Sequence, residues 1–177
     1  MGSNDTSRTT TEPTTSIREQ ADTVHNTAHS AHPKDADNIV VGLDNSPSAP
    51  AALRWAIEEA AKCAGTVTVV STFDGGQRAD VALSRDPDHD LSEHQRHALD
   101  WVARLAHPLK SKVPLVVTTP RATVLDGLVA AAKGARCVVI GRPQDPRLQQ
   151  LPADLAGRCL CPVMVVDPAD PDNPVVA

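Results

Sequence analysis

The sequence is poor in aromatic residues, contains no basic cluster and has no long hydrophobic stretch. Phe, Trp and Tyr make up 2% of the 177 residues, so a packed core has to be aliphatic, and the 41% hydrophobic share is sufficient for one. The net charge of -5 and the lack of any Lys/Arg-rich run argue against nucleic acid as a partner. No apolar run approaches the roughly 20 residues needed to cross a bilayer, so the sequence predicts no membrane span.

Signals for secretion and for a disulfide framework are lacking as well. The N-terminus has no basic-then-apolar leader pattern, and the four cysteines fall in apolar segments without a repeated C-x-x-C spacing. We therefore expect a cytoplasmic protein with reduced, mostly buried thiols. Cys159 and Cys161 are two residues apart, which would put them on one face of a strand. A redox pair or half of a metal site is the alternative there, but we expect no metal site.

The chain divides into a central segment and two terminal segments of different composition. Residues 1–37 are rich in Thr, Ser and His and almost devoid of apolar side chains. Such a segment cannot bury enough surface to offset the entropy lost on ordering, which predicts a disordered N-terminal tail. Residues 168–177 are rich in Pro and Asp and are interpreted as a shorter C-terminal tail, which leaves residues 38–167 as a single domain.

Within the central segment, short β-branched apolar runs alternate with stretches of helical periodicity. The five runs predicted as strands are Asn38–Leu43, Thr66–Ser71, Pro114–Thr118, Arg136–Gly141 and Pro162–Val166. Helices are predicted from Pro47 to Cys63, over 91–111, over 124–133 and, more briefly, before the last strand. This alternation predicts an α/β fold, with an open five-stranded parallel sheet and helices on both faces, of the Rossmann-like kind.

The carboxyl ends of such strands are where ligands bind, and here they fall at Asp44, Thr72, Thr118 and Gly141. Ser46 is placed to cap the first helix, with a proline following at its first position. Asp44 has two interpretations of equal weight. It either contacts a ligand or accepts backbone donors within the turn.

Specific residues at both ends of this domain resemble the universal stress protein family. The family's opening strand, its Gly-x-Asp-x-Ser turn and its Ala-Leu-x-Trp-Ala helix are matched by 39–49 and 52–56, and its fourth and fifth strands by 138–142 and 161–166. The resemblance covers about residues 38–167. It implies an adenine-nucleotide-alpha-hydrolase-like version of the sheet derived above and a role in the stress response.

The resemblance also implies a homodimer formed by antiparallel pairing of the last strand across a twofold axis. The paired edge would comprise Pro162, Val163, Met164, Val165 and Val166. An apolar edge strand needs a partner, which supports the dimer on physical grounds.

One branch of the family binds ATP or AMP through a glycine-rich loop after the fourth strand. Glycines let backbone N–H groups approach phosphate oxygens, but counting from Gly141 this sequence has Gln144 and Asp154 at the later glycine positions. Aligning from the last strand instead places the Gly-Ser pair of the pattern on Gln149 and Gln150. Both alignments predict a member of the non-ATP type, with no required ATP or AMP cofactor.

The candidate nucleotide-binding residues are Asp44, Gly141 and Arg142. Asp44 and Gly141 match family positions, and Arg142 and Arg147 could supply an alternative anion clamp. His94 and His97 are interpreted as part of a solvated helix face. Motifs of hydrolases, P-loop proteins, zinc proteases and dinucleotide-binding enzymes are missing, so we expect no catalytic residues.

The sequence therefore predicts a dimeric regulatory or binding module of the stress response that acts through protein contacts. Its partner protein is unidentified, and the two tails are candidates for contacting it. The alternative is a small-ligand sensor that binds AMP, a cyclic nucleotide or another anion through Asp44, Gly141 and Arg142.

Overall fold

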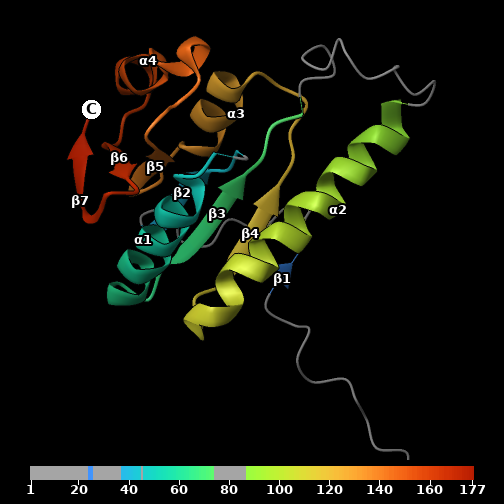
Figure 1. Ribbon diagram of the computed structural model, residues 1–177, viewed down its shortest axis with the longest axis horizontal. Helices are drawn as coiled ribbons and strands as arrows, with labels where there is room; N and C mark the ends of the chain where they lie inside the picture. The colour runs from blue at the N-terminus through green and yellow to red at the C-terminus, as the bar shows by residue number, and fades with distance from the viewer. Residues whose placement is uncertain (1–23, 26–36, 45, 74–86) are drawn as a thin grey trace, which may run out of the picture.

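The computed structural model describes residues 24–25, 37–44, 46–73 and 87–177. They build a seven-stranded sheet with the strand order β1-β4-β3-β2-β5-β6-β7 (Figure 1). The strands are β1 (Val24–His25), β2 (Asn38–Gly42), β3 (Thr66–Val70), β4 (Leu115–Thr118), β5 (Cys137–Gly141), β6 (Val163–Asp167) and β7 (Asp170–Val176). β1 to β6 pair in parallel and β7 pairs antiparallel. The predicted α/β fold is confirmed, with the five expected strands in the middle of the sheet.

Helices cover both faces of the sheet, as the alternating pattern predicts. α1 (Ala49–Lys62) and α2 (Pro87–Ala106) lie on one face, and α3 (Val124–Ala131) and α4 (Leu151–Arg158) lie on the other (Figure 1). Two short 3-10 turns, η2 (His107–Leu109) and η3 (Pro146–Leu148), join them to neighbouring elements. None of the helices in the described ranges is long and apolar enough to cross a membrane.

Each face of the sheet has its own aliphatic core, because successive residues of a strand point to opposite sides. In β2, Ile39 packs beneath α1 and α2, whereas Val40 packs beneath α3 and α4, and both are fully buried. Val102 of α2 and Leu128 of α3 are the corresponding buried helix positions. The core is therefore built without any aromatic side chain at its centre.

The first helix begins two residues later than predicted. α1 starts at Ala49 with Ser48 as its N-cap residue, and Pro50 occupies the first turn, where a missing N–H costs nothing. Ser48 makes no capping bond with its side chain, because its hydroxyl is engaged with the end of β5. The expected cap, Ser46, lies in the preceding turn.

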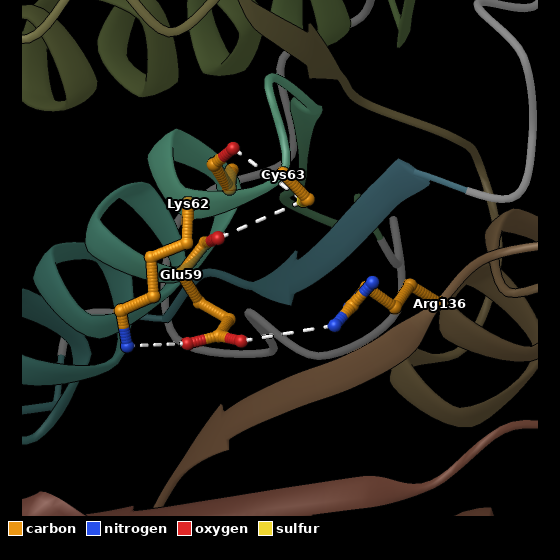
Figure 2. A network of polar contacts seen from close by, with 5 residues as sticks. Glu59, Lys62, Cys63 and Arg136 are labelled. Carbon is orange, nitrogen blue, oxygen red and sulfur yellow. Dashed lines mark hydrogen bonds and ion pairs between the residues drawn. The ribbon is translucent and has the colours of Figure 1, made fainter.

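At the amino ends of the strands, Glu59 connects α1 to the start of β5 (Figure 2). Its Oε2 lies 2.7 Å from Nζ of Lys62, and its Oε1 lies 4.0 Å from Nη2 of Arg136. The Cys63 thiol donates to the carbonyl oxygens of Glu59 and Ala60 in the last turn of the helix. Ion pairs with solvent-exposed partners add little to stability, so these contacts mainly fix how the side chains at the end of α1 are oriented.

The predicted C-terminal tail is wrong, because Asp170–Val176 form strand β7. β7 folds back on β6, with Val176 opposite Met164 and Val175 opposite Val165. Proline is tolerated on an edge strand, so a composition typical of a tail conceals a strand here. As a consequence, the edge predicted for the dimer, Pro162–Val166, is covered by the chain's own C-terminus.

The N-terminal segment also contributes an unpredicted strand. β1 pairs in parallel with β4 at Leu115 and Val116, on the edge of the sheet opposite to β7 (Figure 1). The composition of this part of the tail predicts disorder, but these two residues are ordered against the sheet. Apart from Asp37, the rest of the predicted tail lies outside the described residues.

Candidate functional site

A cleft lies at the carboxyl ends of β2, β3 and β5. β3 and β4 lie on one side of β2 and β5 and β6 lie on the other, so the cleft is at the point where the winding of the sheet changes direction. The cleft is shallow and partly open to solvent, with an interior volume of about 40 Å³. The lining residues of this strand-end cleft are Gly42, Leu43, Asp44, Val70, Thr72, Val124, Leu128, Ile140, Gly141, Pro143, Leu148 and Leu151. Three of the four predicted strand-end positions border it, and Thr118 does not. The lining is mainly aliphatic, with one carboxylate.

Asp44 follows β2 and lies exposed at the rim of the cleft. Its Oδ1 accepts the backbone N–H of Ser46 at 3.0 Å, which is the structural role that the turn suggests for it. A carboxylate has about four acceptor positions, so the bond to Ser46 leaves capacity for donors on a ligand. The structural interpretation is thus seen directly, and the ligand-binding interpretation stays a prediction.

Gly141 ends β5 against the first residues of α1. The Ser48 hydroxyl is fully buried, donates to the carbonyl oxygen of Arg142 at 3.0 Å, and lies 2.9 Å from the hydroxyl of Ser46. A Cβ on Gly141 would lie 2.5 Å from Ser48 Oγ and 2.9 Å from the Ser48 carbonyl carbon. Glycine is therefore required for close packing of α1 on β5, whether or not a phosphate binds.

The two arginines predicted as an anion clamp are paired with carboxylates. Nε of Arg142 lies 2.8 Å from Oδ2 of Asp167, at the end of β6. Arg147 holds Asp145 with Nη2 at 2.7 Å and Nε at 3.1 Å, and these hydrogen bonds lower the pKa of that carboxyl. Among the described residues that line the cleft, none is Arg or Lys. The structure therefore brings Asp44 and Gly141 to the cleft, but it turns the Arg142 side chain to another partner.

The loop after β5 has a different conformation from a phosphate cradle. Asp145 accepts the backbone N–H of Arg147 at 2.9 Å through its side chain and that of Leu148 at 2.9 Å through its carbonyl oxygen. The N–H of Gln149 bonds to the carbonyl of Pro146 at 3.4 Å. Backbone donors that a glycine-rich loop would direct at phosphate are thus used inside η3, and this segment presents Pro143 and Leu148 to the cleft.

The interpretation of His94 as a solvated residue is wrong. Its Nε2 lies 3.1 Å from the Ser71 hydroxyl and 3.3 Å from the Ser71 carbonyl oxygen, and its ring stacks at a tilt on Phe73 with centroids 5.3 Å apart. This nitrogen either donates to the carbonyl oxygen or accepts from the hydroxyl, according to the tautomer of the imidazole. The contact joins α2 to the end of β3, on the face opposite the cleft. Only the tertiary packing of α2 on β3 reveals it.

The cysteines do not form the shared strand face that their spacing suggests. Cys159 ends α4 and Cys161 lies in the loop before β6. Of the four free cysteines only Cys137 is buried, where burial raises its pKa to about 12, and burial raises the pKa of Cys159 and Cys161 as well. Such thiols are poor nucleophiles and poor metal ligands at neutral pH. The described part of the chain holds no group of three or more residues arranged to bind a metal.

The chain was compared with protein-family models and with curated proteins. The model of the universal stress protein family matches residues 36–167. No curated protein matches the chain significantly.

Three solved structures illustrate the likeness of the fold. A universal stress protein in complex with cAMP is 20% identical, with 73% of this chain and 95% of that chain covered and a TM-score of 0.53. The universal stress protein from Archaeoglobus fulgidus in complex with dAMP is 24% identical, with 72% and 95% covered and a TM-score of 0.52. Universal stress protein UspA from Lactobacillus plantarum is 19% identical, with 76% and 99% covered and a TM-score of 0.57.

Proposed function

The chain belongs to the universal stress protein family, and from that premise we propose that it is a binding module whose strand-end cleft takes a nucleoside-type ligand. One observation carries the proposal: the cleft combines an aliphatic lining with the single carboxylate of Asp44. Aliphatic side chains suit the faces of a nucleobase, and a carboxylate at a strand end suits ribose hydroxyls. Two of the similar universal stress proteins are in complex with cAMP and with dAMP, which supports adenine as the base.

The proposal assigns little of the affinity to phosphate. Arg142 and Arg147 are engaged by carboxylates, and the backbone donors of η3 are used within the turn. A phosphate would also add negative charge near Asp44, which costs electrostatic energy because none of the described lining residues is a cation. Adenosine and AMP should therefore bind about as well as ATP.

The module is proposed to be regulatory and not catalytic. The close Ser–His contact that the structure describes, between Ser71 and His94, lies away from the cleft. A cytoplasmic location is part of the proposal, because free cysteines such as these four are typical of a reducing compartment.

Calorimetric titration with AMP tests the role of Asp44. Asp44→Asn keeps an oxygen for the Ser46 N–H but loses the charge, and Asp44→Ala loses both. We expect both variants to weaken AMP binding by roughly tenfold or more, the change that follows from losing a hydrogen bond to a charged group. Asp100→Ala, an exposed aspartate on α2, is the matched control and should bind as the natural protein does. Equal affinity in the natural protein and both Asp44 variants would refute the assignment.

Action through protein contacts is the second candidate. The observation that favours it is a group of exposed apolar side chains, Leu160, Val175 and Val176. Leu160 lies in the loop before β6, and the N–H of Ala177 at the end of β7 bonds to Val163, so Leu160 and the end of β7 lie near the same end of β6. Contiguous exposed apolar surface is typical of protein-binding sites, and Leu160 is the most exposed of these side chains. Leu160→Ser should then reduce the affinity for a purified partner without changing AMP binding, and an unchanged partner affinity would argue against this surface.

A further inference from the structure

β7 occupies the edge of the sheet that a second copy of the chain would need. β6 is an apolar strand, Val-Met-Val-Val, held on one side by four regular pairs with β5. On its other side it meets β7, which runs antiparallel to it. β7 thus takes the position beside β6 that an antiparallel strand from another chain would occupy.

The attachment of β7 is irregular. Its register with β6 shifts between Val165 and Asp167, whereas the β5–β6 pairing continues without a break. Val175 and Val176 remain 58% and 62% exposed, so they bury little apolar surface. The side-chain link from β7 to α1 is an exposed ion pair, Arg54 to Asp172 at 3.3 Å, of the kind worth only about 0.2–1 kcal/mol.

The backbone geometry distinguishes the two sides of β7. The N–H of Ala177 donates to the carbonyl oxygen of Val163 at 2.9 Å. Hydrogen-bonded pairs alternate along an antiparallel ladder, so the next bonded pair is Val165 with Val175, and the N–H of Val176 points away from β6. Pro174 falls on the same outward side as Val176. That position explains why a proline is tolerated there.

We propose that β7 is a displaceable cover and that the uncovered β6 edge pairs with β6 of a second copy. The edge already accepts an antiparallel strand that places valines opposite Met164 and Val165. A second β6 related by a twofold axis offers the same polarity and the same kind of side chain, so the interface is self-complementary. An uncovered apolar edge strand can pair with exposed strands of other proteins, and β7 prevents such pairing while it covers β6. Dimerisation through Pro162–Val166 is then conditional on the state of the C-terminal strand.

Two proline variants of the full-length chain test the proposal by sedimentation velocity over a concentration series. Val175→Pro removes a ladder donor to β6, and Val176→Pro, its matched control, removes an outward N–H. We expect Val175→Pro to lower the dimer dissociation constant roughly tenfold, as loss of about one hydrogen bond and some packing would imply, and Val176→Pro to leave it unchanged.

Other outcomes overturn the proposal. If Val176→Pro alone weakens self-association, the outer side of β7 is the interface. If Val175→Pro does not self-associate more strongly than the natural chain, β7 is not a cover. Should Val175→Pro misfold by circular dichroism, Asp172→Lys takes its place, because it replaces the attraction to Arg54 by repulsion without altering the backbone. It should strengthen the dimer in the same direction, and failure to do so would refute the proposal.

Discussion

Ser48 and Gly141 show how one buried hydroxyl can set the identity of a distant residue. Ser48 Oγ is held between the Arg142 carbonyl and the Ser46 hydroxyl, so it has little freedom to move aside. Because any β-carbon at position 141 would overlap it, Gly141 is explained by packing alone. A loss of ligand binding in a Gly141 variant would therefore not by itself identify a phosphate contact.

The stability of Gly141→Ala tests this explanation. The new Cβ would lie 2.5 Å from Ser48 Oγ, so α1 or β5 has to shift, and overpacking of this kind costs about 1–3 kcal/mol in the free energy of unfolding. Urea denaturation measures it. Gly157→Ala is the matched control, because a β-carbon added at this position in α4 would have no atom within 4 Å, and it should gain about 0.5–1 kcal/mol. Gly141→Ala that is as stable as the natural chain would contradict the packing argument.

Cys137 predicts an alkaline limit to stability. Burial raises its pKa to about 12 in the folded protein from an ordinary value of 9.0, so the folded state keeps a proton that the unfolded state loses first. The resulting stability is fully present below pH 9 and is lost as the pH rises towards 12. Cys137→Ala should therefore show a shallower fall in melting temperature than the natural chain as the pH rises through this window. Parallel curves would show that this thiol is not responsible.

At the scale of elements, the start of α3 shapes one wall of the cleft. Thr123 caps the helix by accepting the backbone N–H of Asp126 at 3.1 Å, and its hydroxyl donates to the Asp126 carboxylate at 2.8 Å. Arg158 of α4 reaches the same carboxylate at 3.0 Å. The helix that follows carries Val124 and Leu128, which line the cleft. The cap thus connects helix stability to the shape of the site.

Replacement of this cap has a defined cost. Thr123→Ala leaves an N–H at the helix start without its partner and should lower the free energy of unfolding by about 1 kcal/mol in urea denaturation. Thr123→Ser keeps the oxygen and should stay close to the natural value. If serine is as destabilising as alanine, the methyl group and not the cap accounts for the effect.

Which elements the sequence can predict depends on what stabilises them. β2 to β6 are fully or partly buried β-branched runs, and their composition alone identifies them. β7 and β1 depend on backbone pairing with strands that are already in place, and their composition carries no such signal. The start of α1 differs from its predicted position because Ser48 directs its hydroxyl to β5, a contact across 94 positions of sequence.

At the scale of the whole molecule, the candidate site also combines features that the sequence predicts with features that depend on tertiary contacts. Asp44 and Gly141 are predictable, because parallel topology brings strand ends to one edge of the sheet. The Arg142 side chain pairs with Asp167 of β6, and the backbone N–H groups of η3 are bonded within the turn; neither contact can be predicted from the sequence. The glycines missing from the loop predict that it holds no phosphate, but only the structure shows which hydrogen bonds the loop makes instead. The molecule as a whole has a strand-end cleft, while Arg142, Arg147 and the backbone donors of η3 serve other contacts.

The affinity of adenosine relative to that of ATP is the measurement that tests this view most directly. Calorimetric titration of the natural chain with each ligand, at the same ionic strength, should give dissociation constants within about threefold of each other, since phosphate finds no charge-assisted bonds worth roughly 1.5–3 kcal/mol each. ATP binding more than about tenfold tighter than adenosine would mean that a phosphate site exists after all, and no binding of either would leave the cleft without its proposed ligand.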